Sequence, residues 1–127
     1  MQCLLISVSK LTHVPTADIV EYLGHDGAGR GFNIFEVIEF LLRKTQFKPV
    51  YLERQVWSPT GQLLSTDLTE DYYDLPIPKI VTTVDGTPHA VAMCRDGSVY
   101  DSALRRGLNY CELEELRCSH HGLMLFY

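Results

Sequence analysis

Three residues in this sequence together have the side-chain types that nucleophilic chemistry needs. They are a cysteine near the start, a histidine and an aspartate. Cys3 begins the apolar segment CLLISVSKL, while His89 and Asp101 lie in TPHAVAMCRDGSVYDSA, residues 87–103. A thiolate is a strong nucleophile, but it needs a base as partner, and the base needs a group that holds its orientation. Cys3, His89 and Asp101 are therefore candidates for a nucleophile, a general base and an orienting carboxylate.

Whether His89 and Asp101 can meet depends on the turn between their strands. A two-residue turn at Asp96-Gly97 would point Asp101 to the face opposite His89. A three-residue loop over 95–97, with Gly97 left-handed and a G1 bulge, places Asp101 opposite Val91 and on the His89 face. Diagonal neighbours on one face are about 7–8 Å apart at the backbone, which an imidazole and a carboxylate can span. The sequence permits both registers, and the order Arg-Asp-Gly suits the second.

The first element that has to position these groups is a short helix over residues 3–11. Leu4, Val8 and Leu11 recur there with helical spacing, and Cys3 lies in the first turn. The dipole and the free N–H groups of a helix N-terminus favour a thiolate. Two β-branched residues in the same stretch, Ile6 and Val8, leave a strand as the alternative.

Two further helices are predicted before residue 46. In the first, ADIVEYL, Thr16 is expected as the N-cap, Asp18 lies in the first turn and Gly24 ends the helix. The glycine-rich stretch HDGAGRGF, residues 25–32, is predicted to be a loop. The next helix runs through Lys44 from a capping-box-like pair at Asn33 and Glu36. Its predicted apolar face consists of Ile34, Val37, Ile38, Leu41 and Leu42.

An antiparallel sheet is predicted after Gln46. Its strands are expected in FKPVYLE (47–53), in a meander of IVTTV, PHAVAMC and SVYDS joined at Asp85-Gly86 and 95–97, and in the tail at 113–118 and 123–127. The stretch 54–78 is less regular, and its acidic part, DLTEDYYD, is expected to be exposed. Helices followed by an antiparallel sheet indicate an α+β fold. We expect one domain over 1–127, with a helical part at about 1–46 and a sheet part at about 47–127.

The bulk composition is that of a soluble globular chain. It has 127 residues, of which 46% are apolar and 21% charged, with a net charge of −5. The acidic balance argues against nucleic-acid binding. Neither an apolar run of about 18 residues nor a secretion signal is visible, so we expect no membrane span and a cytoplasmic location. The four cysteines are then expected to be free thiols.

The order of these elements resembles the papain-like cysteine peptidases: a cysteine on an N-terminal helix, a histidine that opens a sheet strand, and an aspartate that ends the next strand. The resemblance is closest to compact bacterial and phage members related to double-glycine leader peptidases. It covers about half of the chain. The matching segments are QCLLISVSKLTHVPTADIVEYLG, RGFNIFEVIEFLLRKTQFKPVYLE and HAVAMCRDGSVYDS.

This resemblance implies a peptidase without a cofactor, in which Cys3 is the nucleophile, His89 the general base and acid, and Asp101 the residue that holds the His89 tautomer. The substrate would be a peptide or protein, cleaved at a peptide or isopeptide bond, in the host cytoplasm if the chain is phage-encoded. The Cys3 backbone N–H and a side-chain amide would hold the oxyanion. The family places a glutamine several residues before the cysteine, whereas only Met1 and Gln2 precede Cys3 here. Gln2 is therefore the candidate, with Asn33 and His25 as alternatives.

Other interpretations compete with catalysis. The same fold could serve as a catalytically inactive protein-binding module, or as a structural module. Cys118, His120 and His121 invite a metal site, but they lack paired C-x₂-C spacing, and adjacent histidines on a strand point to opposite faces. We therefore expect no metal there. The loop HDGAGRG does not fit a phosphate-binding motif. The sequence does not indicate an oligomeric state.

Overall fold

The computed structural model describes residues 3–28, 32–66, 69–83 and 89–127. The helices formed by these residues are α1 (Cys3–Thr12), α2 (Thr16–Leu23), α3 (Ile34–Lys44), α4 (Glu70–Tyr73) and α5 (Tyr110–Ser119). Their strands are β1 (Pro49–Glu53), β2 (Gln55–Trp57), β3 (Leu63–Thr66), β4 (Lys79–Thr83), β5 (His89–Met93), β6 (Val99–Asp101), β7 (Arg106–Gly107) and β8 (Gly122–Phe126).

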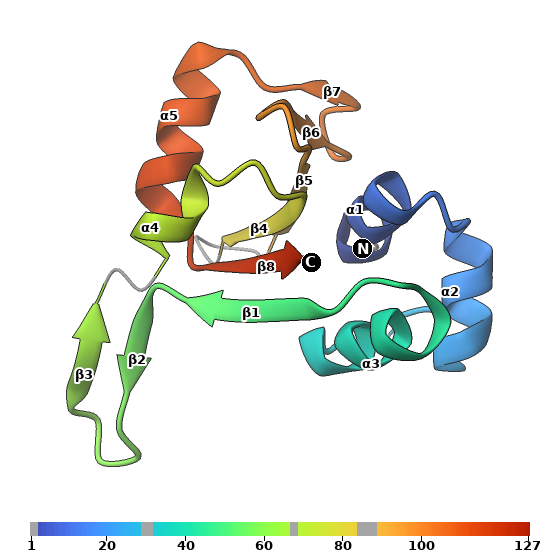
Figure 1. Ribbon diagram of the computed structural model, residues 1–127, viewed down its shortest axis with the longest axis horizontal. Helices are drawn as coiled ribbons and strands as arrows, with labels where there is room; N and C mark the ends of the chain where they lie inside the picture. The colour runs from blue at the N-terminus through green and yellow to red at the C-terminus, as the bar shows by residue number, and fades with distance from the viewer. Residues whose placement is uncertain (1–2, 29–31, 67–68, 84–88) are drawn as a thin grey trace.

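Six of the strands form one antiparallel sheet in the order β1-β8-β4-β5-β6-β7. The helices pack on this sheet, so the predicted α+β class is confirmed. The remaining two strands, β2 and β3, pair only with each other and form a ribbon that projects from the rest of the molecule in Figure 1. The last strand, β8, lies between β1 and β4 and ties the two halves of the sheet together.

The two faces of the sheet carry separate apolar clusters. Figure 1 shows α1, α2 and α3 on one side and α4 with α5 on the other. The alternation of each strand divides its side chains between these sides, as in β5, where Ala90 joins the α1 cluster and Val91 joins the α5 cluster. Sheet residues facing α1–α3 include Ile80, Met124 and Phe126, while those facing α5 include Val81, Val99 and Leu123.

Several predicted elements are confirmed. The first helix has Cys3 in its first turn. Asn33 and Glu36 form a complete capping box at α3. The Asn33 side chain accepts from the backbone N–H of Glu36, and the Glu36 carboxylate accepts from the backbone N–H of Asn33 at 3.0 Å. Gly24 ends α2 with φ 81°, a left-handed conformation that favours glycine. The three meander strands are β4, β5 and β6, and β8 is the expected final strand. The Asp85-Gly86 turn lies outside the described residues.

Other expectations were wrong in detail. The N-cap position of α2 is Pro15, with no side-chain cap, and Thr16 is the first helical residue. On α3 Leu42 is 56% exposed, and Phe40 is buried in its place. The stretch 113–118 lies within helix α5 rather than in a strand.

The irregular stretch 54–78 contains more structure than expected. It includes the ribbon of β2 and β3 and the short helix α4. In its acidic part, Glu70, Asp71 and Asp74 are exposed as expected, whereas Thr69 and Tyr73 are buried. They are buried because α4 packs between the sheet and α5.

Candidate active site

The turn between β5 and β6 adopts the register that brings the predicted base and carboxylate together. The N–H of Cys94 donates to the carbonyl of Ser98 at 2.8 Å, which leaves a three-residue loop over 95–97. Gly97 has φ 89°, as the left-handed position of this loop requires. The register pairs Ala92 with Tyr100, so that the next positions out are Val91 and Asp101. Of the two registers that the sequence permits, the structure has the second, which places Asp101 on the His89 face.

His89 and Asp101 form a direct hydrogen bond. The distance from His89 Nε2 to Asp101 Oδ1 is 3.0 Å, and the side chains are 23% and 12% exposed. Asp101 Oδ1 also accepts from the backbone N–H of Ala103 at 2.8 Å, which fixes the carboxylate. An ionised carboxylate only accepts, so this geometry favours the tautomer with the proton on Nε2. The lone pair of His89 Nδ1 is then the basic position of the ring.

Helix α1 runs alongside β5 in the same direction. Ser7 Oγ lies 3.3 Å from the carbonyl oxygen of Ala90, near the start of β5. Three residues further along the helix, Lys10 Nζ lies 5.0 Å from the ring centroid of Tyr100, a residue that pairs with the later part of β5. The N-terminus of α1 therefore lies at the end of β5 where His89 begins the strand.

Cys3 occupies this N-terminus. It precedes Ser7 by one turn, about 6 Å along the axis at about 1.5 Å per residue. The residue is 8% exposed, and α1 has no acidic residue in its first turn. Within the described residues, its thiol makes no hydrogen bond to His89 or Asp101.

The pleat of β5 sets the path by which this thiol and the imidazole could meet. Ala90 faces α1, whereas His89 points to the face shared with Val91 and Asp101. A contact between Cys3 and His89 therefore has to form around the end of β5, where His89 is the first strand residue. Of the three predicted residues, His89 and Asp101 are hydrogen-bonded to each other, and Cys3 lies at the same end of β5 without a bond to either.

Of the three candidates for the oxyanion side chain, the structure describes Asn33 and His25. Gln2 lies outside the described residues. The side chain of Asn33 accepts from the N–H of Phe35 at the start of α3. His25 Nε2 lies 3.1 Å from Glu36 Oε1, and its Nδ1 accepts from the N–H of Gly27. Asn33 and His25 are thus engaged in capping and loop contacts.

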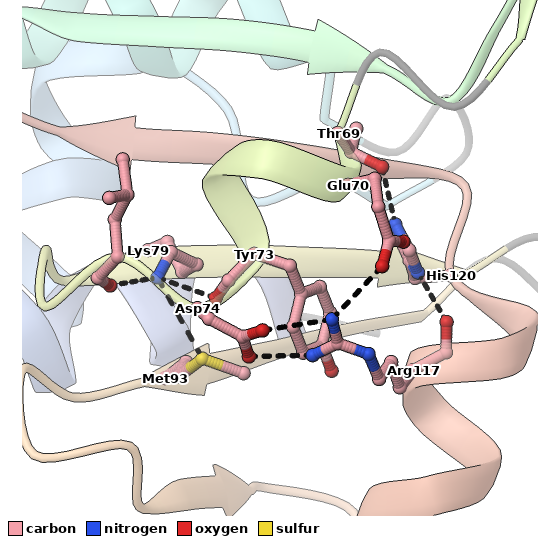
Figure 2. Close-up of polar contacts among 9 residues, drawn as sticks. Thr69, Glu70, Tyr73, Asp74, Lys79, Met93, Arg117 and His120 are labelled. Atoms are coloured by element: carbon pink, nitrogen blue, oxygen red, sulfur yellow. Dashed lines mark hydrogen bonds and ion pairs between the residues drawn. The ribbon is translucent and has the colours of Figure 1, made fainter.

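A second polar cluster, which the sequence did not predict, lies between α4, α5 and β4 (Figure 2). His120 Nδ1 donates to the carbonyl of Arg117 at 2.7 Å, so its Nε2 accepts from the Thr69 hydroxyl at 2.6 Å. Burial lowers the pKa of His120 below its ordinary value. Thr69 and His120 are 0% and 3% exposed, so this hydroxyl–imidazole pair offers no surface to a substrate.

Charged residues complete this cluster. Arg117 binds both carboxylate oxygens of Asp74 at 2.6 and 2.9 Å, and its guanidinium lies 4.6 Å from the centroid of the Tyr73 ring. These bonds lower the pKa of Asp74, while burial raises that of Tyr73 to about 12. Lys79 is buried, donates to the carbonyls of Tyr73 and Leu75 at 3.0 and 2.7 Å, and has a pKa lowered by burial. The cluster holds α4 between α5 and the sheet.

The sequence carried one signal for this cluster, the histidine pair beside Cys118 that invited a metal. Cys118 and His121 do not join His120: Cys118 is exposed, and His121 Nε2 lies 3.8 Å from Glu53. Across the described ranges, no three histidine, cysteine or acidic side chains converge as metal ligands would. The partners of His120 come instead from α4 and from its own helix.

No family model, curated protein or solved structure matches this chain. Among the described helices, none alone has the length and apolar character to span a membrane, although the pair α1 and α2, bent by 118°, meets that criterion in length and composition only.

Proposed function

We propose that this protein is a thiol hydrolase of the papain-like type, acting on peptide or isopeptide bonds. The observation that carries the proposal is the 3.0 Å bond from His89 Nε2 to Asp101, at the end of β5 where α1 presents Cys3. It supplies an oriented imidazole whose Nδ1 remains free to act as a base. The helix N-terminus supplies backbone N–H groups that can hold a negative charge developing in the reaction.

In the acylation step, His89 Nδ1 takes the Cys3 proton, and the thiolate attacks the substrate carbonyl carbon to form a C–S bond. The negative charge that develops on the carbonyl oxygen is held by backbone N–H groups at the start of α1, which have no partner within the helix. The imidazolium then gives its proton to the leaving nitrogen, and the C–N bond breaks. The products are a free amine and a thioester on Cys3.

In the deacylation step, His89 takes a proton from water while the water oxygen attacks the thioester carbonyl. The C–S bond breaks, and the proton returns to the Cys3 sulfur. Asp101 keeps the ring in the required tautomer throughout and stabilises the imidazolium. No oxidant, reductant or metal is needed for this cycle.

The burial of the thiol favours one alternative. Cys3 is 8% exposed and has no hydrogen bond to His89 or Asp101 within the described residues. In this alternative the protein is a non-catalytic binding module on the same fold, and the His89–Asp101 bond only secures the hairpin. The two functions differ in one measurable property, the reactivity of Cys3 toward a substrate-like electrophile.

The test uses peptides that carry a vinyl sulfone, with site-resolved mass spectrometry of the adduct. We expect labelling at Cys3 that is lost in Cys3→Ala and falls by about two orders of magnitude or more in His89→Ala. The exposed thiol of Cys111 on α5 is the internal control, and it should react at the rate of a simple thiol in every variant. Labelling only at the exposed cysteines, or at Cys3 without dependence on His89, would overturn the proposal in favour of the binding module.

A further inference from the structure

A cavity of about 560 Å³ lies at the other end of β5, away from His89. Three separate segments form its walls: the end of α1 with the following turn, the residue before β4, and the turn from β5 to β6. Leu11 and Pro78 give it apolar walls, and the half-buried thiol of Cys94 lines it as well. None of the residues placed in the candidate active site lines this cavity.

The charge of the lining is unlike that of the chain. Lys10, His13 and Arg95 all border the cavity, and no acidic residue does so in the described parts of the chain. The whole sequence has 16 acidic against 11 basic residues. The nearest acid in sequence, Asp96, turns its carboxylate to the N–H and hydroxyl of Ser98 at 2.9 and 2.6 Å. The cavity is therefore a local region of positive charge on an acidic protein.

Two of these residues, Lys10 and His13, lie at the end of α1. The Lys10 ammonium lies 5.0 Å from the ring centroid of Tyr100. His13 has φ 63°, a left-handed conformation that a residue with a side chain rarely adopts, and its N–H donates to the carbonyl of Ser9 at 2.8 Å. The carbonyl of Val8 accepts from Thr12 Oγ1. These two bonds tie Thr12 and His13 to the last turns of α1.

We propose that this cavity is a binding site for a compact oxyanion, a phosphate or a carboxylate carried on a small apolar body. The Arg95 guanidinium offers the planar pair of donors that suits either group, and Lys10 and His13 add donors from the end of α1 and the turn that follows it. The apolar walls would contact the body of the ligand. The proposal uses none of the catalytic residues, so it stands or falls independently of the thiol hydrolase.

The thiol of Cys94 can report the electrostatic potential of the cavity that it lines. Iodoacetate is anionic and iodoacetamide is neutral, and both alkylate a thiol by the same chemistry. The ratio of their rates at one cysteine therefore reports the local potential, while thiol exposure largely cancels. Cys111 is the reference within the same protein, because it lies on α5 beside Glu112. Peptide mass spectrometry resolves the two sites.

We expect the iodoacetate-to-iodoacetamide ratio to be several-fold higher at Cys94 than at Cys111, and the difference to collapse in 1 M NaCl. Lys10→Gln and Arg95→Gln should each bring the ratio at Cys94 down toward that at Cys111. The matched control is Lys44→Gln, since Lys44 also lies over a tyrosine ring, 5.6 Å from the centroid of Tyr22, but outside the cavity. That variant should leave the ratio unchanged.

Binding is then tested by competition. Inorganic phosphate and acetate are added separately at constant ionic strength, and we expect at least one of them to slow iodoacetate at Cys94 but not at Cys111. The effective competitor identifies the oxyanion. Equal ratios at the two cysteines, insensitivity to both cavity variants, or an absence of protection by either anion would each overturn the proposal. If Cys94 resists alkylation, the thermal unfolding midpoint is measured instead. Phosphate or acetate must then raise the midpoint of the wild type more than the midpoint of the Lys10→Gln, Arg95→Gln double variant.

Discussion

Replacing His120 by phenylalanine is expected to lower the free energy of unfolding by about 2–4 kcal/mol. The ring contact with Tyr73, at 5.0 Å between centroids, is retained by the new side chain. The variant leaves the Thr69 hydroxyl and the Arg117 carbonyl without their partner, after bonds of 2.6 and 2.7 Å. A buried polar group left unsatisfied costs about 1–3 kcal/mol, and the added apolar burial of phenylalanine offsets part of the sum.

The same residue makes the stability depend on pH. Burial lowers the pKa of His120 in the folded protein below the ordinary value of 6.5. Between the folded pKa and 6.5 the unfolded chain binds more protons than the folded protein, so the free energy of unfolding falls as the pH falls through this window. Above 6.5 the contribution is fully present. His120→Phe should therefore show a shallower loss of stability from pH 7.5 to 5.5 than the wild type.

Urea unfolding followed by circular dichroism at the two pH values measures both effects. The matched control is His121→Phe, because His121 is the adjacent histidine and makes only a 3.8 Å contact with Glu53. That control should change the free energy of unfolding by less than about 1 kcal/mol. A His120→Phe variant as stable as the wild type, or one with an unchanged pH dependence, would refute the role of the Thr69–His120–Arg117 chain.

Three further predictions concern single residues. Gly97→Ala should destabilise the protein by about 1–2 kcal/mol in urea unfolding, because φ is 89° and no atom lies within 4 Å of the added Cβ, so the cost is one of backbone conformation alone; a neutral result would mean that the loop over 95–97 does not need a left-handed residue. Asn109→Ala should cost about 1 kcal/mol through loss of the α5 N-cap, and Asn109→Asp should restore most of it. Tyr73→Phe should reduce the loss of stability between pH 10 and 12. The pKa of Tyr73 is about 12 in the folded protein against 10 in the unfolded chain, so the wild type loses this contribution as the pH rises through that interval. Identical alkaline stability profiles of the two proteins would contradict the burial of the phenol.

Local signals in the sequence predicted the elements whose ends are fixed by short-range bonds. The helix α3 begins at the Asn33 and Glu36 pair, and the loop over 95–97 has its glycine at the left-handed position. From that loop the register of β5 and β6 follows, and with it the bond between His89 and Asp101. This much of the candidate site could be predicted because it depends on one turn.

The same kind of signal was present at α5 and was missed. Asn109 and Glu112 form a capping box like the one at α3, and Glu112 is also held by Arg106 at 2.6 and 2.8 Å. The helix buries little apolar surface beyond Leu116, so its apolar periodicity is weak and the stretch 113–118 was interpreted as a strand. Side-chain capping, rather than the apolar pattern, marks where this helix begins.

Long-range packing could not be predicted from the sequence. The burial of Lys79 and of His120 results from α4 folding into the space between α5 and the sheet, and the sequence around α4 is acidic and suggested exposure. The position of Cys3 relative to His89 is likewise set by how α1 lies along β5. The Thr69–His120 and Ser7–Ala90 contacts join residues 51 and 83 positions apart, and no local pattern encodes them.

The central claim is that His89 activates Cys3, and the pH dependence of Cys3 alkylation tests it most directly. Iodoacetamide rates at Cys3 are measured by peptide mass spectrometry from pH 4 to 10 in the wild type and in His89→Ala, with Cys111 as the unactivated thiol in the same samples. The proposal predicts substantial Cys3 alkylation well below about pH 8.5, where free cysteine is half ionised, and loss of that low-pH reactivity in His89→Ala. A Cys3 profile that follows Cys111 and does not change in His89→Ala would contradict it.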